Sequence, residues 1–149
     1  MPIDFSPVSD EAFTYARRLS RQFQASLILL HVIEPPGLPG LAGTVQAPAV
    51  LKKASADAEK SLSNLTQSLK DEDRKRISSQ TRSGLAAHEI NAAAKEEDVD
   101  LVVIGSHGLT SGTHFCIGTT AERVARAAPC SVLVVRQKEY ELSSGGNAA

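Results

Sequence analysis

Apolar residues are concentrated in short, dense runs along the chain. The densest are residues 26–33 (SLILLHVI), 101–104 (LVVI) and 131–135 (SVLVV). Runs of this length and composition are typical of β-strands that are covered on both faces of a sheet. A weaker alternation at residues 77–82 predicts a more polar strand at the edge of a sheet.

Helical spacing of apolar residues fills most of the chain between these runs. A first helix is expected to start at Ser6 or Ser9, which can cap it. Its inward stripe would consist of Ala12, Phe13, Ala16, Leu19 and Phe23. Three more helices are expected at about residues 49–69, 86–97 and 119–128.

Other stretches lack both patterns. Residues 34–48 contain four prolines and three glycines, which predicts a long loop. Asp71, Glu72 and Asp73 predict a charged turn. The polar tail, residues 137–149, is expected to lie outside a single folded domain formed by residues 1–136.

The alternation of strands and helices predicts a parallel sheet with helices on both faces. Only three residues of this sequence precede a turn at Asp4, so either the first strand is very short or the chain starts upstream of Met1. Ligands of such sheets bind beyond the carboxyl ends of the strands, where the strand order reverses. We therefore expect Asp4, the end of the next strand near Val32, and the loop at Gly105 to meet at one site.

The stretch that follows the LVVI run combines glycines with hydroxyl-bearing residues. Gly105 and Gly108 allow the backbone to approach a ligand closely. Gly118, Thr119 and Thr120 open the next helix, whose first amide groups have no partner within the helix and carry the positive end of its dipole. A phosphate group suits such amides, and the hydroxyls add donors. Plain turns and a helix N-cap at Thr119 are the structural alternatives.

The histidines and cysteines give weaker indications. His31 lies in an apolar run and is interpreted as a core residue. His107 lies in the glycine loop, where both a ligand contact and a structural hydrogen bond fit. Cys116 and Cys130 lack CxxC spacing and are interpreted as free thiols in a reducing compartment. No pair of histidines has the spacing of metal ligands on one face.

Composition narrows the class of protein. With 149 residues, 42% of them apolar and 22% charged, the chain has the size and balance of one globular domain. A formal charge of -1 and the lack of a Lys/Arg cluster argue against nucleic acid as the main partner. No apolar run approaches the ~20 residues that cross a bilayer, and no signal peptide is recognised. A cytoplasmic protein without a membrane partner is therefore expected.

Three segments together resemble the universal stress protein family. They are residues 2–6 (PIDFS), residues 29–35 (LLHVIEP) and the glycine loop. The family's ATP-binding signature is Gly, two residues, Gly, nine residues, Gly, and then Ser or Thr. That spacing is met without insertion or deletion by Gly105, Gly108, Gly118 and Thr119. The resemblance extends over residues 2–136.

The resemblance implies an α/β fold: a single-domain, three-layer α/β/α sandwich around a five-stranded parallel sheet of order 3-2-1-4-5. This arrangement is Rossmann-like and belongs with the adenine nucleotide alpha hydrolase-like folds, here with a truncated first strand. Family members usually form homodimers through their last strands, which would involve residues 131–135 in this chain. Members with the signature bind ATP, often with Mg²⁺ or Mn²⁺.

The function implied is an ATP-binding stress-response switch or partner-binding module with at most slow ATP hydrolysis. No dedicated catalytic base is recognised, so no catalytic residue and no protein metal ligand are assigned. The family's contacts to adenine and ribose would fall on Pro2, Ile3, Asp4 and Val32. Its contacts to ribose and phosphates would fall on Gly105, His107, Gly108, Gly118, Thr119 and Thr120.

Two other functions stay open. A dimeric interaction protein of the same fold, without nucleotide binding, would use the loop at residues 34–48 for a partner. An adenylating enzyme of the same broad fold would carry an SGGxDS-type loop after the first strand. This chain has DFSPVS at that point, which disfavours the enzyme.

Overall fold

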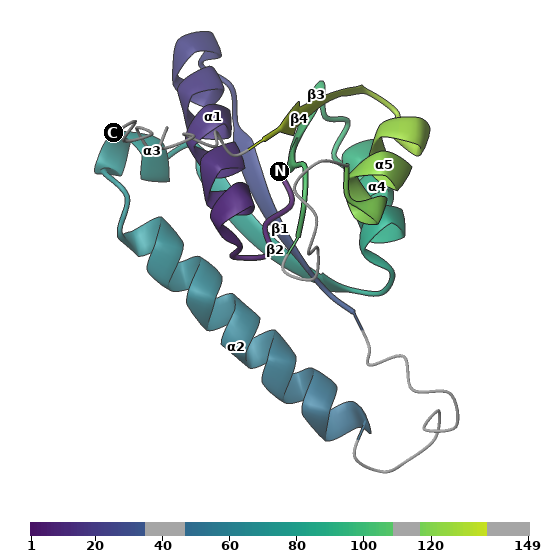
Figure 1. The fold of residues 1–149 in the computed structure, drawn as a ribbon. Helices are drawn as coiled ribbons and strands as arrows, with labels where there is room; N and C mark the ends of the chain where they lie inside the picture. The colour runs from purple at the N-terminus through teal and green to yellow at the C-terminus, as the bar shows by residue number, and fades with distance from the viewer. Residues whose placement is uncertain (35–46, 109–116, 137–149) are drawn as a thin grey trace, which may run out of the picture.

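The computed structural model describes residues 1–34, 47–108 and 117–136, in which helices and strands alternate along most of the chain (Figure 1). The helices are α1 (Pro7–Phe23), α2 (Ala47–Gln67), α3 (Asp71–Arg74), α4 (Ala86–Glu96) and α5 (Thr119–Ala127). The strands are β1 (Leu27–Ile33), β2 (Ile77–Ser83), β3 (Leu101–Gly105) and β4 (Ser131–Val135). Every predicted helix and strand of four residues or more is present, and its ends agree with the prediction within two residues.

The strands form two parallel pairs. β1 pairs with β2, with Leu27 opposite Ile77, and β3 pairs with β4, with Leu101 opposite Ser131. Within the described residues no ladder of hydrogen bonds joins one pair to the other. The parallel α/β class is therefore confirmed, whereas the continuous five-stranded sheet is not seen.

The N-terminal segment lies beside β1 but is too short to form a strand. Pro2 makes an isolated parallel bridge with Leu30. The Leu30 N–H donates to the Met1 carbonyl oxygen at 2.9 Å, and the Ile3 N–H donates to the Leu30 carbonyl oxygen at 2.9 Å. The segment thus completes one step of a parallel ladder with β1 and does not pair with β3 within the described residues.

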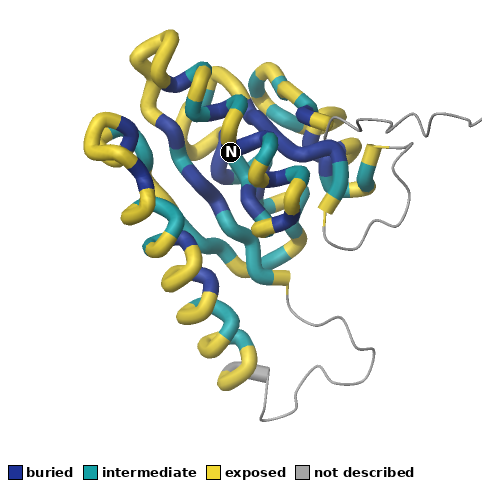
Figure 2. The backbone as a smooth tube through the Cα atoms, turned by 60° about the vertical axis from the view of Figure 1, so that its left-hand side comes forward, coloured by how far each residue is buried: buried dark blue, intermediate teal, exposed yellow. Residues whose placement is uncertain are grey.

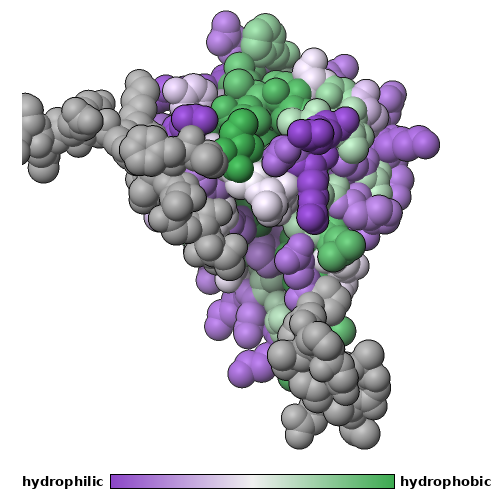
Figure 3. Space-filling view, turned by 45° about the vertical axis from the view of Figure 1, so that its right-hand side comes forward, coloured by the Kyte–Doolittle hydropathy of each residue, from purple (hydrophilic) through white to green (hydrophobic). Residues whose placement is uncertain are grey.

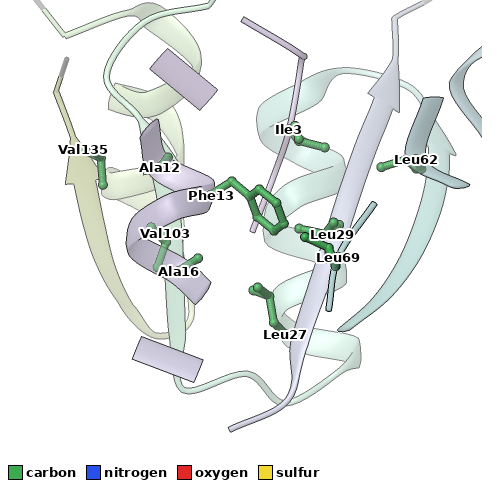
Figure 4. Packing of buried hydrophobic residues seen from close by; sticks show 10 residues of the cluster. All are labelled: Ile3, Ala12, Phe13, Ala16, Leu27, Leu29, Leu62, Leu69, Val103 and Val135. Atoms are coloured by element: carbon green, nitrogen blue, oxygen red, sulfur yellow. The ribbon is translucent and has the colours of Figure 1, made fainter. Parts of the chain in front are cut away.

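Helices cover both faces of the strands, as predicted. α1 and α2 pack on one face, and α4 and α5 pack on the other (Figure 1). Leu29 and Val103 belong to the core under α1, whereas Leu30 and Ile104 belong to the core under α4 and α5. Figure 4 shows the Phe13 ring reaching from α1 toward Leu29. This burial on both faces explains the nearly continuous apolar runs of the sequence.

α1 begins where its capping residues predict. Ser6 is the N-cap, its hydroxyl accepts a hydrogen bond from the Ser9 N–H at 3.2 Å, and Pro7 is the first helical residue. The predicted inward stripe is buried or half-buried except for Phe23, which is 69% exposed. Phe23 lies at the last position of the helix, where it lines an open cavity instead of a closed core.

The predicted charged turn is in fact a short helix, α3, and it buries one of its acids. Asp73 is 4% exposed and lies between two arginines of α1. Arg17 Nη2 donates to Asp73 Oδ2 at 2.7 Å, and Arg21 Nε donates to Asp73 Oδ1 at 2.6 Å. The pKa of Asp73 is lowered to about 2, chiefly by its hydrogen bonds from Arg21. Burial acts in the opposite direction and is outweighed, and Arg17 adds to the lowering.

The outer surface of the molecule carries both hydrophobic and hydrophilic residues. α2 lies along the outside and turns only one side inward, where Ala58 and Leu62 are buried (Figure 2). On the face shown in Figure 3, the most prominent hydrophobic patch lies in the upper part of the view among hydrophilic side chains, and smaller hydrophobic spots lie apart from it. Within the described ranges, no helix combines the length and the apolar character that crossing a membrane requires.

Candidate functional site

A pocket of about 330 Å³ opens at the carboxyl ends of β1 and β3. Small-molecule sites typically enclose ~300–1,000 Å³, so the size suits a compact ligand. All ten residues that the sequence analysis assigned to a ligand line this pocket. They are Pro2, Ile3, Asp4, Val32, Gly105, His107, Gly108, Gly118, Thr119 and Thr120. The structure thus brings these residues together, and their contact with a ligand stays a prediction.

Asp4 is positioned by the turn that leads into α1. Its Oδ1 accepts a hydrogen bond from the Ser6 N–H at 3.0 Å. Phe5 has a left-handed φ of 61°, which residues with a Cβ resist, and its ring centroid lies 5.1 Å from that of His31. The His31 Nδ1 lies 2.8 Å from the Ile3 carbonyl oxygen. This strained and well-contacted turn fixes Asp4 at the pocket wall.

The glycine that ends β3, Gly105, and the one three residues later, Gly108, stand where a side chain would have too little space. A Cβ on Gly105 would lie 3.1 Å from Val8 Cγ1, so glycine lets α1 approach the end of β3. A Cβ on Gly108 would lie 2.8 Å from Asp4 Oδ2. Neither glycine has a positive φ. Gly105 and Gly108 therefore allow close packing against Val8 and Asp4, in addition to any close approach of a ligand.

Ser106 joins the two sides of the glycine loop. It is fully buried, and its N–H donates to the Val135 carbonyl oxygen at 2.7 Å. Its carbonyl oxygen accepts from the Gly118 N–H at 2.7 Å, and its Oγ lies 2.7 Å from His107 Nδ1. These bonds hold the start of α5 next to the end of β3. Residues 109–116, which include His114 and Cys116, lie outside the described residues.

The start of α5 faces the pocket with its backbone. Gly118, rather than Thr119, is the N-cap, with φ -64° and ψ 153°, and no side chain caps the helix. The first amides of a helix have no intrahelical acceptor, so those that follow Gly118 are available for an anion. Thr119 and Thr120 line the pocket and add hydroxyl donors. The sequence-based expectation of an anion-binding helix start therefore fits the geometry.

Four polar residues on the pocket wall were not assigned from the sequence: Ser9, His31, Glu34 and Ser106. His31, interpreted as a core residue, is half-buried at the pocket. Glu34 Oε1 accepts a hydrogen bond from the Ala86 N–H at 2.8 Å, and so it caps α4, which has no other side-chain cap. The signal that could have identified His31 and Glu34 is their place at the carboxyl end of an apolar run.

The pocket has little cationic character. No Lys or Arg is among the described residues that line it, whereas Asp4 and Glu34 are. The described part of the chain also holds no group of three or more His, Cys, Asp or Glu side chains suited to a metal ion. An anion would therefore be held by amides and hydroxyls, and a divalent cation would have to be bound largely by the ligand itself.

Comparison with known proteins agrees with this fold and pocket. A family model described as the Universal stress protein family matches residues 1–136. The chain therefore belongs to the universal stress protein family. Universal stress protein MJ0531 of Methanocaldococcus jannaschii is 30% identical over 144 residues, which cover 95% of this chain and 82% of that protein.

Solved structures share the fold. Universal stress protein UspA from Lactobacillus plantarum has a TM-score of 0.81 at 27% identity, over 91% of this chain and 94% of that one. A universal stress protein in complex with cAMP has a TM-score of 0.58 at 22% identity, over 93% of this chain and 94% of that one. At that identity the second likeness establishes the fold alone.

Proposed function

We propose that this protein binds ATP in the pocket at the carboxyl ends of β1 and β3 and acts as a cytoplasmic, nucleotide-dependent switch or partner-binding module. The observation that carries the proposal is the meeting of two distant segments at one pocket. Asp4 lies on one wall, and the start of α5 at Gly118 and Thr119 lies on another. The carboxylate offers an acceptor for an amine or a ribose hydroxyl, and the helix start offers donors to phosphates.

The proposal includes a divalent cation. The described wall offers no cationic side chain to balance a triphosphate, and the helix start supplies only about half a positive charge. Mg²⁺ or Mn²⁺ bound to the phosphates and to water would supply the missing charge. We therefore expect ATP to bind more tightly with Mg²⁺ than with EDTA.

Hydrolysis is proposed to be slow at most. The acids on the pocket wall already serve the fold, because Asp4 accepts from the Ser6 N–H and Glu34 accepts from the Ala86 N–H. Fast phosphoryl transfer needs a group that orients the attacking water and charges that stabilise the transition state. The described wall of this pocket offers helix amides to stabilise the transition state, but no acid that is free of such a structural role to orient the water.

Isothermal titration with ATP and Mg²⁺ tests the proposal. We expect saturable binding, and cAMP serves as a competitor because a protein of this fold has been solved with it. Gly118→Val should weaken ATP binding about tenfold or more, since it places a branched side chain at the helix amides. Ala125→Val is the matched control, because Ala125 is exposed on the same helix and does not line the pocket. Absence of heat and of a thermal shift at millimolar ATP would contradict the proposal.

A second candidate is a dimeric interaction protein of the same fold that binds no nucleotide. The absence of Lys and Arg from the described pocket wall favours it. It predicts that Gly118→Val leaves partner binding and the stress phenotype unchanged. For either candidate, we propose that two copies associate through the free edge of β4, which pairs only with β3 within the described residues.

A further inference from the structure

Asp4 lies between two residues that are contacted by the same side chain. His31 Nδ1 lies 2.8 Å from the Ile3 carbonyl oxygen. The His31 ring centroid lies 5.1 Å from that of Phe5, and the two ring planes are tilted by 37°. Ile3 and Phe5 are the neighbours of Asp4 in the sequence. His31 therefore contacts the chain on both sides of the acid that the proposed function assigns to the nucleotide.

The contact with Ile3 holds the backbone at the point where its pairing with β1 ends. The Ile3 N–H donates to the Leu30 carbonyl oxygen at 2.9 Å, but the bridge between Pro2 and Leu30 is isolated. A carbonyl oxygen can only accept, so His31 Nδ1 carries the hydrogen and donates it to Ile3. A side chain of β1 thus continues the attachment of this segment where the backbone ladder stops.

The contact with Phe5 supports a backbone conformation that is costly without it. The φ of Phe5 is 61°, in the left-handed region, and residues with a Cβ keep such angles only where their surroundings determine them. Phe5 is 36% exposed, and the next residue, Ser6, is already fixed as the N-cap of α1. The turn is therefore held by the helix cap on one side and by His31 on the other.

The direction of the Asp4 carboxylate depends on this turn. Its Oδ1 accepts from the Ser6 N–H at 3.0 Å, and its Oδ2 lies beside Gly108, where an added Cβ would be 2.8 Å away. If the turn relaxed, the carboxylate would move relative to Gly108. The start of α5 would stay in place, because the Gly118 N–H donates to the Ser106 carbonyl oxygen at 2.7 Å.

We propose that His31 is a positioning residue for the Asp4 carboxylate and contributes to nucleotide affinity through that acid. This inference rests on the proposed function and deepens it, because it assigns His31 to recognition of the nucleoside part of ATP and not of its phosphates. A histidine with a merely structural role would affect stability and would weaken every ligand of the pocket alike.

A double-mutant cycle tests the proposal, with His31→Phe and Asp4→Asn measured singly and together by isothermal titration with ATP and Mg²⁺. His31→Phe retains an aromatic ring and loses the donor to Ile3. We expect it to weaken ATP binding about tenfold alone and less than about twofold beside Asp4→Asn, because residues that act as a unit are not additive. Equal effects of His31→Phe in the two backgrounds would overturn the proposal.

A conservative variant tests the hydrogen bond itself. His31→Asn places an amide N–H donor close to the position of Nδ1, so we expect ATP affinity within about threefold of the wild type. Binding as weak as that of His31→Phe would overturn the proposal. His88→Phe is the matched control, because the His88 side chain is 75% exposed and does not line the pocket, and it should leave the affinity unchanged.

Inorganic tripolyphosphate with Mg²⁺ separates positioning from general damage to the pocket. We expect its affinity to change less than about twofold in His31→Phe, because the start of α5 is held independently of His31. A loss as large as that for ATP would overturn the proposal.

Phe5→Gly provides a second route to the same test if His31→Phe does not fold. Glycine tolerates the left-handed φ, and the change removes the ring that His31 contacts. We expect about threefold weaker ATP binding, again only where Asp4 is present, and no effect would overturn the proposal. Failure of the wild type to bind ATP would contradict the proposed function and this inference together. Binding by the wild type with additive effects in the cycle would contradict this inference alone.

Discussion

Asp73 links α3 to α1 through one buried carboxylate between two arginines. Its pKa of about 2 lies below the ~3.9 of an unfolded aspartate, so its stabilising effect is complete above pH ~4 and is lost as the pH falls toward 2. We predict that Asp73→Asn lowers the free energy of unfolding at pH 7 by about 1–2 kcal/mol, a value reduced because the arginines are partly exposed. Urea unfolding from pH 7 to pH 2 should show the two proteins converging below pH 4.

Asp71→Asn is the matched control for this prediction. Asp71 belongs to the same short helix, but it is 87% exposed and lies 3.4 Å from Arg74. Exposed pairs of this kind contribute little, so the change should stay within about 0.5 kcal/mol. If both variants lower the free energy of unfolding at pH 7 by the same amount, the burial of Asp73 between the arginines does not explain its contribution to stability.

At the scale of elements, α4 depends on a residue that belongs to another part of the chain. Its N-cap, Leu85, provides no side-chain hydrogen bond, and Glu34 after β1 provides one to the Ala86 N–H at 2.8 Å. We predict that Glu34→Ala lowers the free energy of unfolding by about 1 kcal/mol, since a helix N–H loses its acceptor. Glu34→Gln retains an acceptor oxygen and should lose less. Denaturant titration measures both, and equal losses would contradict the capping role.

The same contacts show which features the sequence could reveal. Periodicity located every helix and strand except α3 to within two residues, because burial on one or both faces leaves a local pattern. The residues assigned to a ligand line one pocket because the strands are parallel and their carboxyl ends meet. Asp73 and Glu34 escaped prediction because their partners lie 52 to 56 residues away, and no local pattern records such a pair. His31 has the structural hydrogen-bond distance to the Ile3 carbonyl oxygen that suits a core residue, but its place on the pocket wall was not predicted.

At the scale of the whole molecule, the free edge of β4 should decide the oligomeric state. The Val135 carbonyl faces β3, so the backbone groups of Val132 and Val134 point to the free edge, and Leu133 beside them is 37% exposed. We predict that the wild-type protein is a dimer and that Leu133→Lys is a folded monomer, because two copies would place like charges together. Sedimentation equilibrium measures this. Leu85→Lys makes the same change at a 70% exposed site away from β4 and should remain dimeric. A monomeric wild type, or a dimeric Leu133→Lys variant, would exclude pairing through this edge.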